Sequence, residues 1–159
     1  MVNIDRKPPR LAAGERETLM TLWQYHRESV VRKVEGLDTV TASRQLVKSD
    51  TTLLWLLRHL IRAESLWIHG RFAGHHEMVP PDEVPAGDSV EAAVADYRAC
   101  WARIDERVGR HELDELATGD DQTPPVNLRW IVTHLLEETA RHAGHADILR
   151  EQLDGQLGR

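Results

Sequence analysis

The sequence predicts an all-α protein with the architecture of a four-helix bundle. Four segments of about 20 residues each carry apolar residues at helical spacing, which marks one buried face per helix. Stretches rich in proline, glycine and polar residues separate these segments, and no segment alternates apolar and polar residues as a half-buried strand does. Amphipathic helices bury their apolar faces against one another, and 159 residues are enough for one core. We therefore expect a single bundle domain over residues 1–159.

The first two helices are expected over residues 14–34 and 49–72. Gly36 follows the first and Gly74 follows the second, and glycine commonly ends a helix. A polar connector, residues 36–48, joins them. The apolar face of the first helix contains Leu19, Leu22, Trp23, His26, Val30, Val31 and Val34, and that of the second contains Leu53, Leu56, Leu57, Leu60, Ala63 and Leu66.

The last two helices are expected over residues 88–108 and 127–154. Asp88 is the expected N-cap of the third helix, because Glu91 follows at the spacing of a capping box. The prolines of residues 75–87 exclude regular structure before it, and a second polar connector, residues 119–125, comes after it. Asn127 is the expected N-cap of the last helix, which Gly155 ends.

Composition and charge narrow the range of partners. A net charge of −6 gives no reason to expect nucleic acid or an anionic membrane as partner. No apolar run approaches the roughly 20 residues needed to cross a bilayer, and residues 5–10 lack the apolar stretch of a signal peptide, so a cytoplasmic location is expected. The single cysteine, Cys100, excludes an internal disulfide and a cysteine-rich zinc module.

The most informative segment is the last helix, where two polar side chains interrupt an apolar face. Glu138 and His142 lie one turn apart in the row of residues that is expected to face the core. A buried carboxylate is costly unless it is paired or bound to a metal, and a metal ion would explain both residues at once. The row reads Leu128, Ile131, Leu135, Glu138, His142, Ala146, Leu149 and Leu153.

A third ligand has to come from another helix, and His59 is the best candidate. It lies beside Leu60 on the expected apolar face of the second helix. Two imidazoles and one carboxylate leave an open position, as catalytic zinc sites do. Zinc is the first expectation, and nickel, iron or manganese accept the same ligands. Without a metal, Glu138 would instead pair with an arginine or histidine inside the core.

Other histidines have weaker claims to a role. His134 and His145 lie close to the same face of the last helix and are candidates for proton transfer, for a fourth ligand or for orienting a ligand. Half-exposed flank positions are the plainer interpretation of both. His26 is a weaker metal-site candidate on the first helix. Four histidines at helix ends or in loops are expected to be solvated, namely His69, His75, His76 and His111.

The chain resembles the DinB-like metal-binding four-helix bundles. The resemblance is carried by residues 57–64, LRHLIRAE, with Trp67 after them, and by residues 128–147, LRWIVTHLLEETARHAGHAD. It is closer to the actinobacterial branch related to the N-terminal domain of mycothiol-dependent maleylpyruvate isomerase. Many members carry HxxxH on the last helix, whereas this chain, like that isomerase, has glutamate first. The resemblance implies His59, Glu138 and His142 as metal ligands.

The resemblance also implies a function. Characterised relatives are thiol S-transferases and isomerases, so we expect a divalent-metal-dependent S-transferase that uses mycothiol or a similar low-molecular-weight thiol and an electrophile. A metal-assisted hydrolase is the second hypothesis, because a three-ligand site also activates water. A non-catalytic metal-binding bundle is the third. A homodimer is expected as well, since bundles of this family often pair through helix faces.

Overall fold

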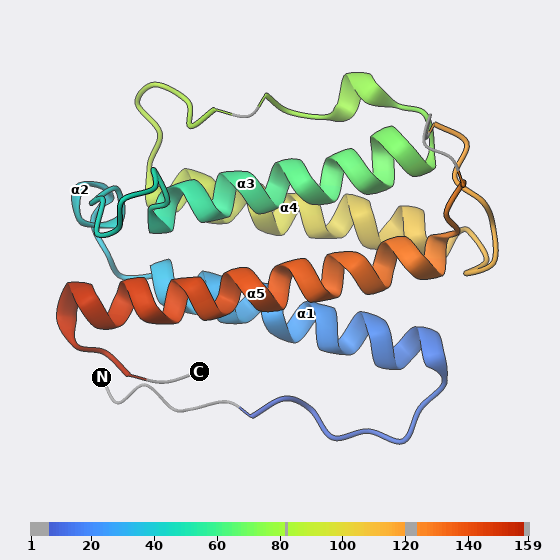
Figure 1. Cartoon of the computed structure of the whole chain (residues 1–159), viewed down its shortest axis with the longest axis horizontal. Helices are drawn as coiled ribbons and strands as arrows, with labels where there is room; N and C mark the ends of the chain where they lie inside the picture. The colour runs from blue at the N-terminus through green and yellow to red at the C-terminus, as the bar shows by residue number, and fades with distance from the viewer. Residues whose placement is uncertain (1–6, 82, 120–123, 158–159) are drawn as a thin grey trace.

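A computed structural model of the chain describes residues 7–81, 83–119 and 124–157. It confirms the all-α prediction, because those residues form helices and one isolated bridge between Leu116 and Asn127, without a strand. Two earlier predictions fall partly outside the described residues. They are the absence of a signal peptide, at residues 5 and 6, and the second connector, at residues 120–123. The long helical elements in Figure 1 are α1 (Glu15–Val34), α3 (Leu53–Ser65) with its continuation η1 (Leu66–Phe72), α4 (Val90–Gly109) and α5 (Leu128–Asp154).

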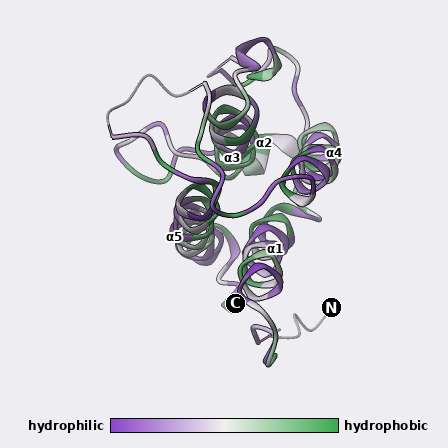
Figure 2. Ribbon diagram, turned by 90° about the vertical axis from the view of Figure 1, so that its right-hand side faces the viewer, coloured by the Kyte–Doolittle hydropathy of each residue, from purple (hydrophilic) through white to green (hydrophobic). Residues whose placement is uncertain are grey.

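The four helices form the expected bundle. Helix α1 packs along α5, α3 packs along α4, and α3 also meets α5. Viewed near the bundle axis, they stand at the four corners (Figure 2). None of the helices in the described part of the chain has the length and apolar character needed to span a bilayer. The core between them includes Trp23, Val30, Leu56, Leu60, Ile104 and Ile131, all of which are fully buried.

The second helix differs from the prediction in its last turns. Residues 53–72 are helical as expected, but η1 is a π-helix rather than an α-helix. A π-turn adds one residue per turn and therefore rotates the side chains that follow it out of the 3.6-residue pattern. The loop before α5 holds this segment in place, because Thr118 N donates to Phe72 O at 2.9 Å and Gly119 N donates to Arg71 O at 2.8 Å.

Helix capping also departs from the prediction at one point. Ser89, not Asp88, caps α4, since its side chain accepts from Ala92 N at 3.1 Å. Asp88 instead binds Arg58 of α3, whose Nε donates to it at 2.7 Å. Asn127 caps α5 as predicted. The first connector contains a short helix, α2 (Thr39–Ala42). The prediction that residues 75–87 lack regular structure is wrong at one place, because the 3₁₀-helix η2 (His76–Met78) forms there, before the prolines.

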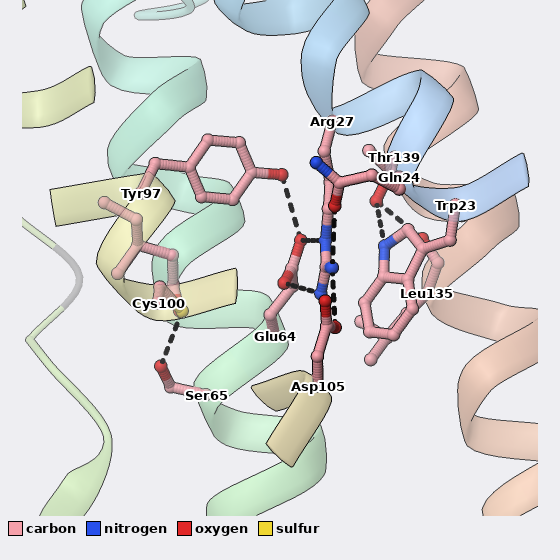
Figure 3. Close-up of polar contacts among 11 residues, drawn as sticks. Trp23, Gln24, Arg27, Glu64, Ser65, Tyr97, Cys100, Asp105, Leu135 and Thr139 are labelled. Atoms are coloured by element: carbon pink, nitrogen blue, oxygen red, sulfur yellow. Dashed lines mark hydrogen bonds and ion pairs between the residues drawn. The ribbon is translucent and has the colours of Figure 1, made fainter. Parts of the chain in front are cut away.

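A buried polar network joins α1, α3 and α4 in the middle of the bundle (Figure 3). Arg27 donates to Glu64 through Nε at 3.1 Å and Nη2 at 2.6 Å, and both residues are completely buried. Tyr97 donates to Glu64 at 2.9 Å, and Asp105 accepts from Arg27 at 2.8 Å. The predicted apolar face of the first helix is therefore wrong at His26, which stays partly exposed while its neighbour Arg27 is buried.

Candidate metal centre

The three predicted ligands come together between α3 and α5. His59 Nε2 lies 3.3 Å from Glu138 Oε1, and His142 Nε2 lies 3.0 Å from the same oxygen. One ligand atom from each residue falls within 4.8 Å of the other two, which is close enough for a single ion to contact all three. Helix α5 supplies two of them because residues four apart share a face.

Two of these side chains, His59 and Glu138, are half-buried rather than deep in the core, and His142 is buried. The exposed fractions are 25% for His59, 20% for Glu138 and 11% for His142. The prediction that Glu138 faces the core is wrong in this respect. Thr139 takes the core position at this turn, is fully buried and accepts a hydrogen bond from Trp23 Nε1 at 3.0 Å. Glu138 lies beside it and faces α3, so the group is open to solutes at the bundle surface.

The protonation states suit a metal ligand set. Burial raises the pKa of Glu138, but hydrogen bonds from His59 and His142 outweigh it and hold that pKa below its usual value. Burial lowers the pKa of His142, only partly offset by its hydrogen bond to Glu138. A carboxylate and a neutral imidazole are the forms that bind divalent metals.

Neighbouring rings fix the two imidazoles. Trp55 stacks on His59 with ring centroids 4.7 Å apart and an interplanar angle of 17°. His145 Nδ1 lies 3.2 Å from His142 Nδ1, so the ring nitrogen that faces away from Glu138 has a partner of its own. Such outer partners orient ligand histidines in metal sites. Trp55 lies four residues before His59 on the same helix, and this spacing is the sequence signal for the contact.

Comparison with known families identifies the chain. The family model described as mycothiol-S-transferase matches residues 18–155. The chain belongs to this family. No curated protein matches it.

Two solved structures share the fold of this mycothiol S-transferase family member. A DinB-like protein from Bacillus cereus ATCC 10987 is 20% identical, with a TM-score of 0.65 over 86% of this chain and 91% of that one. A conserved protein from Enterococcus faecalis is 15% identical, with a TM-score of 0.65 over 91% of this chain and 100% of that one. At these identities the likeness shows the DinB-like fold alone.

Two hollows flank the three-residue group in this family member. One, of about 170 Å³, is lined by His59, Glu138, His134 and Trp67 among others. His134 stacks on Trp130 there at 5.1 Å between centroids and meets the edge of Trp67 at 4.8 Å. The other hollow, of about 250 Å³, lies on the far side of His145. Its lining is largely apolar and consists of Val47, Ser49, Thr51, His145, Ile148 and Leu149.

The remaining histidines are not part of this group. His26 lies on α1 beside Tyr25, in a shallow pocket with Ser29 and Asp147. His75 and His76 are exposed as predicted, and His111 is partly exposed and bound to Glu115. The prediction that His69 is solvated is wrong, because the π-turn brings it into the protein, where it is 2% exposed.

Proposed function

We propose that this chain is a divalent-metal-dependent S-transferase that joins a low-molecular-weight thiol, mycothiol or a close relative, to an electrophile. The observation that carries this proposal is the meeting of His59, Glu138 and His142 within 4.8 Å on two rigid helices. Membership of the mycothiol S-transferase family supports the choice of thiol. Two imidazoles and a carboxylate favour zinc, with nickel as the other candidate.

The residues present fit a metal with one open position. Three protein ligands leave room for the thiol sulfur, and the lowered pKa values of Glu138 and His142 favour the forms that bind a metal. When bound, the ion lowers the pKa of that thiol so that thiolate forms near neutral pH.

Two further histidines of the chain have roles in proton transfer and in positioning a ligand. His134 opens into the hollow beside Glu138, and we assign it the thiol proton. His145 holds His142 through the 3.2 Å contact and is a positioning residue. The thiolate sulfur forms a bond to the electrophilic atom, and the leaving group departs with the electron pair of the bond that breaks. The apolar hollow beyond His145 suits the electrophile.

The test is metal content and thiol transfer in matched variants. Elemental mass spectrometry of the wild type should find a near-stoichiometric divalent metal, which Glu138→Ala and His142→Ala should lose together with transfer of mycothiol to a chromogenic aryl halide. Glu137→Ala, one residue away on the exposed side of α5, should keep both. Transfer activity retained in a metal-free variant would refute the proposal.

The other outcomes point to the alternative functions. Metal-dependent turnover without any thiol would favour hydrolysis, and a metal that raises the melting temperature without binding thiol would favour a non-catalytic bundle. The homodimer and the cytoplasmic location stay predictions, and analytical ultracentrifugation of the metal-loaded protein tests the first of these.

A further inference from the structure

A further cavity is lined by η1 at a residue that borders neither of the two hollows described above, His69. It has a volume of about 220 Å³ and lies between η1, η2 and the last turns of α4. Three arginines and one glutamate line it, in a chain whose overall charge is −6. Its lining consists of His69, Met78, Arg103, Glu106, Arg107, Arg110 and His111.

His69 is the unusual residue of this cavity. It is 2% exposed, and neither ring nitrogen has a hydrogen-bond partner among the described residues. Buried polar atoms are paired in the great majority of cases, so each exception calls for an explanation, such as an ordered water or a bound ligand. The π-helix places His69 here, and π-turns often occur at functional sites.

Two of the arginines have no carboxylate partner in the described part of the chain. Arg103 forms no hydrogen bond or ion pair within the described residues, and Arg107 contacts only the Met78 sulfur, at 3.9 Å, while its buried Nε has no partner. They are not needed to cap α4 either. Arg16 of α1 does that, donating to Val108 O at 2.9 Å and to the next loop's carbonyl at 2.6 Å.

The electrostatics select the kind of ligand. Burial, then the charges of Arg107, Arg103 and His75, lower the pKa of His69 to about 4, so its ring is neutral at pH 7. A neutral imidazole offers one N–H donor, and the guanidinium groups add several more. Metal cations would be repelled by the arginines, whereas an oxyanion would be bound by charge-assisted hydrogen bonds.

We propose that the cavity formed by His69, Arg103 and Arg107 is a binding site for a small oxyanion, a phosphate or a carboxylate group. Arg110 is paired with Glu106, so Arg103 and Arg107 are the arginines that remain to face the anion. The volume accommodates a free ion or the anionic end of a small metabolite. This site is independent of the metal centre and of the proposed S-transfer.

The test follows the imidazole ¹⁵N resonances of His69, assigned by their absence in His69→Gln. The full-length protein is titrated in chloride-free buffer with inorganic phosphate and, separately, with succinate. We expect a saturable change at submillimolar concentration with one of the two, which identifies the class of anion. Arg103→Gln/Arg107→Gln should weaken that binding at least tenfold. Arg98→Gln, an exposed arginine of α4 paired with Glu35, should leave it within twofold.

Two results would overturn the proposal. One is no saturable change with either anion, which would leave water as the partner of His69. The other is equal binding in the double variant and in the wild type. Circular dichroism first shows whether the double variant is folded. If it is not, the single variant Arg103→Gln replaces it, because Arg103 is exposed and its loss leaves no buried gap.

Discussion

Breaking the buried ion pair between Arg27 and Glu64 at the centre of the bundle should lower the free energy of unfolding far more than breaking an exposed pair. Glu64 accepts two hydrogen bonds from Arg27 and one from Tyr97, with no exposed surface on either member of the pair. Burial raises the pKa of Glu64, and Arg27 and then Tyr97 oppose that rise. Glu64→Gln keeps the shape but leaves the buried guanidinium with Asp105 as its one carboxylate partner among the described residues, beside a hydrogen bond to Gln24. Removing one partner of a buried pair costs about 3–5 kcal/mol, and because Asp105 remains we expect about 3 kcal/mol.

Urea denaturation followed by circular dichroism measures this loss. With a slope near 2 kcal/mol per molar urea, a loss of about 3 kcal/mol moves the midpoint down by about 1.5 M. The matched control is Glu35→Gln, the same chemical change in the ion pair between Arg98 and Glu35, whose side chains are 49% and 45% exposed. Exposed pairs contribute about 0.5 kcal/mol, so its midpoint should barely move.

A further variant separates charge from packing. Arg27→Met/Glu64→Leu removes both charges and keeps apolar volume, so it should recover most of the stability that Glu64→Gln loses. The reasoning is refuted if Glu64→Gln loses no more stability than Glu35→Gln. It is also refuted if the double variant is less stable than Glu64→Gln, because the loss would then not come from an uncompensated charge.

Three further predictions concern the π-helix and the candidate metal centre. Between pH 6.5 and 4 the unfolded chain binds a proton at His69 that the folded chain does not, so the free energy of unfolding should fall as pH is lowered through that window, by up to about 3 kcal/mol. In His69→Gln this pH-dependent loss of stability should be absent. The free energy of unfolding of both proteins is measured by urea denaturation at several pH values, and an equal pH dependence in the two would contradict the prediction. Gly119→Ala would place a Cβ 2.3 Å from Gly70 O, so calorimetry should show a loss of about 2 kcal/mol and a melting temperature about 6 °C lower; an unchanged melting temperature would show that the loop relaxes freely. Trp55→Ala removes the ring stacked on His59 and should weaken zinc binding about tenfold in a chelator competition, whereas an equal affinity would remove this ring from the site.

Helical periodicity predicted the fold because each long helix buries one apolar face. It also predicted the meeting of His59, Glu138 and His142, since a polar residue inside an apolar row needs a partner. The same signal was present at Arg27, four residues after Trp23 and three before Val30, and at Glu64 between Leu60 and Ile68. Each was missed because it is a single polar residue on its helix, whereas Glu138 and His142 lie one turn apart and mark the same face together.

The environment of His69 could not be predicted for a different reason. A regular helix that ended near residue 72 would leave this side chain on the flank, and the prediction of a solvated histidine followed from that geometry. The π-turn changes the rotation of every residue after Ser65. Nothing in local propensity specifies a π-turn. Contacts of Phe72 and Arg71 with the loop before α5, close to 50 residues later in the chain, hold it.

The helical segment formed by α3 and η1 carries enclosed polar residues with a partner in the chain and one without. His59 meets α5, Glu64 meets α1 and α4, and His69 faces the end of α4, so each of these polar side chains is enclosed by a different neighbour. An enclosed polar side chain needs a partner. Glu64 finds it in Arg27, whereas His69 has none among the described residues. At Glu64 the chain supplies the partner and the role is structural, whereas the unpartnered ring of His69 is the ground for the proposed ligand site. The arginines beside His69 make that ligand an anion.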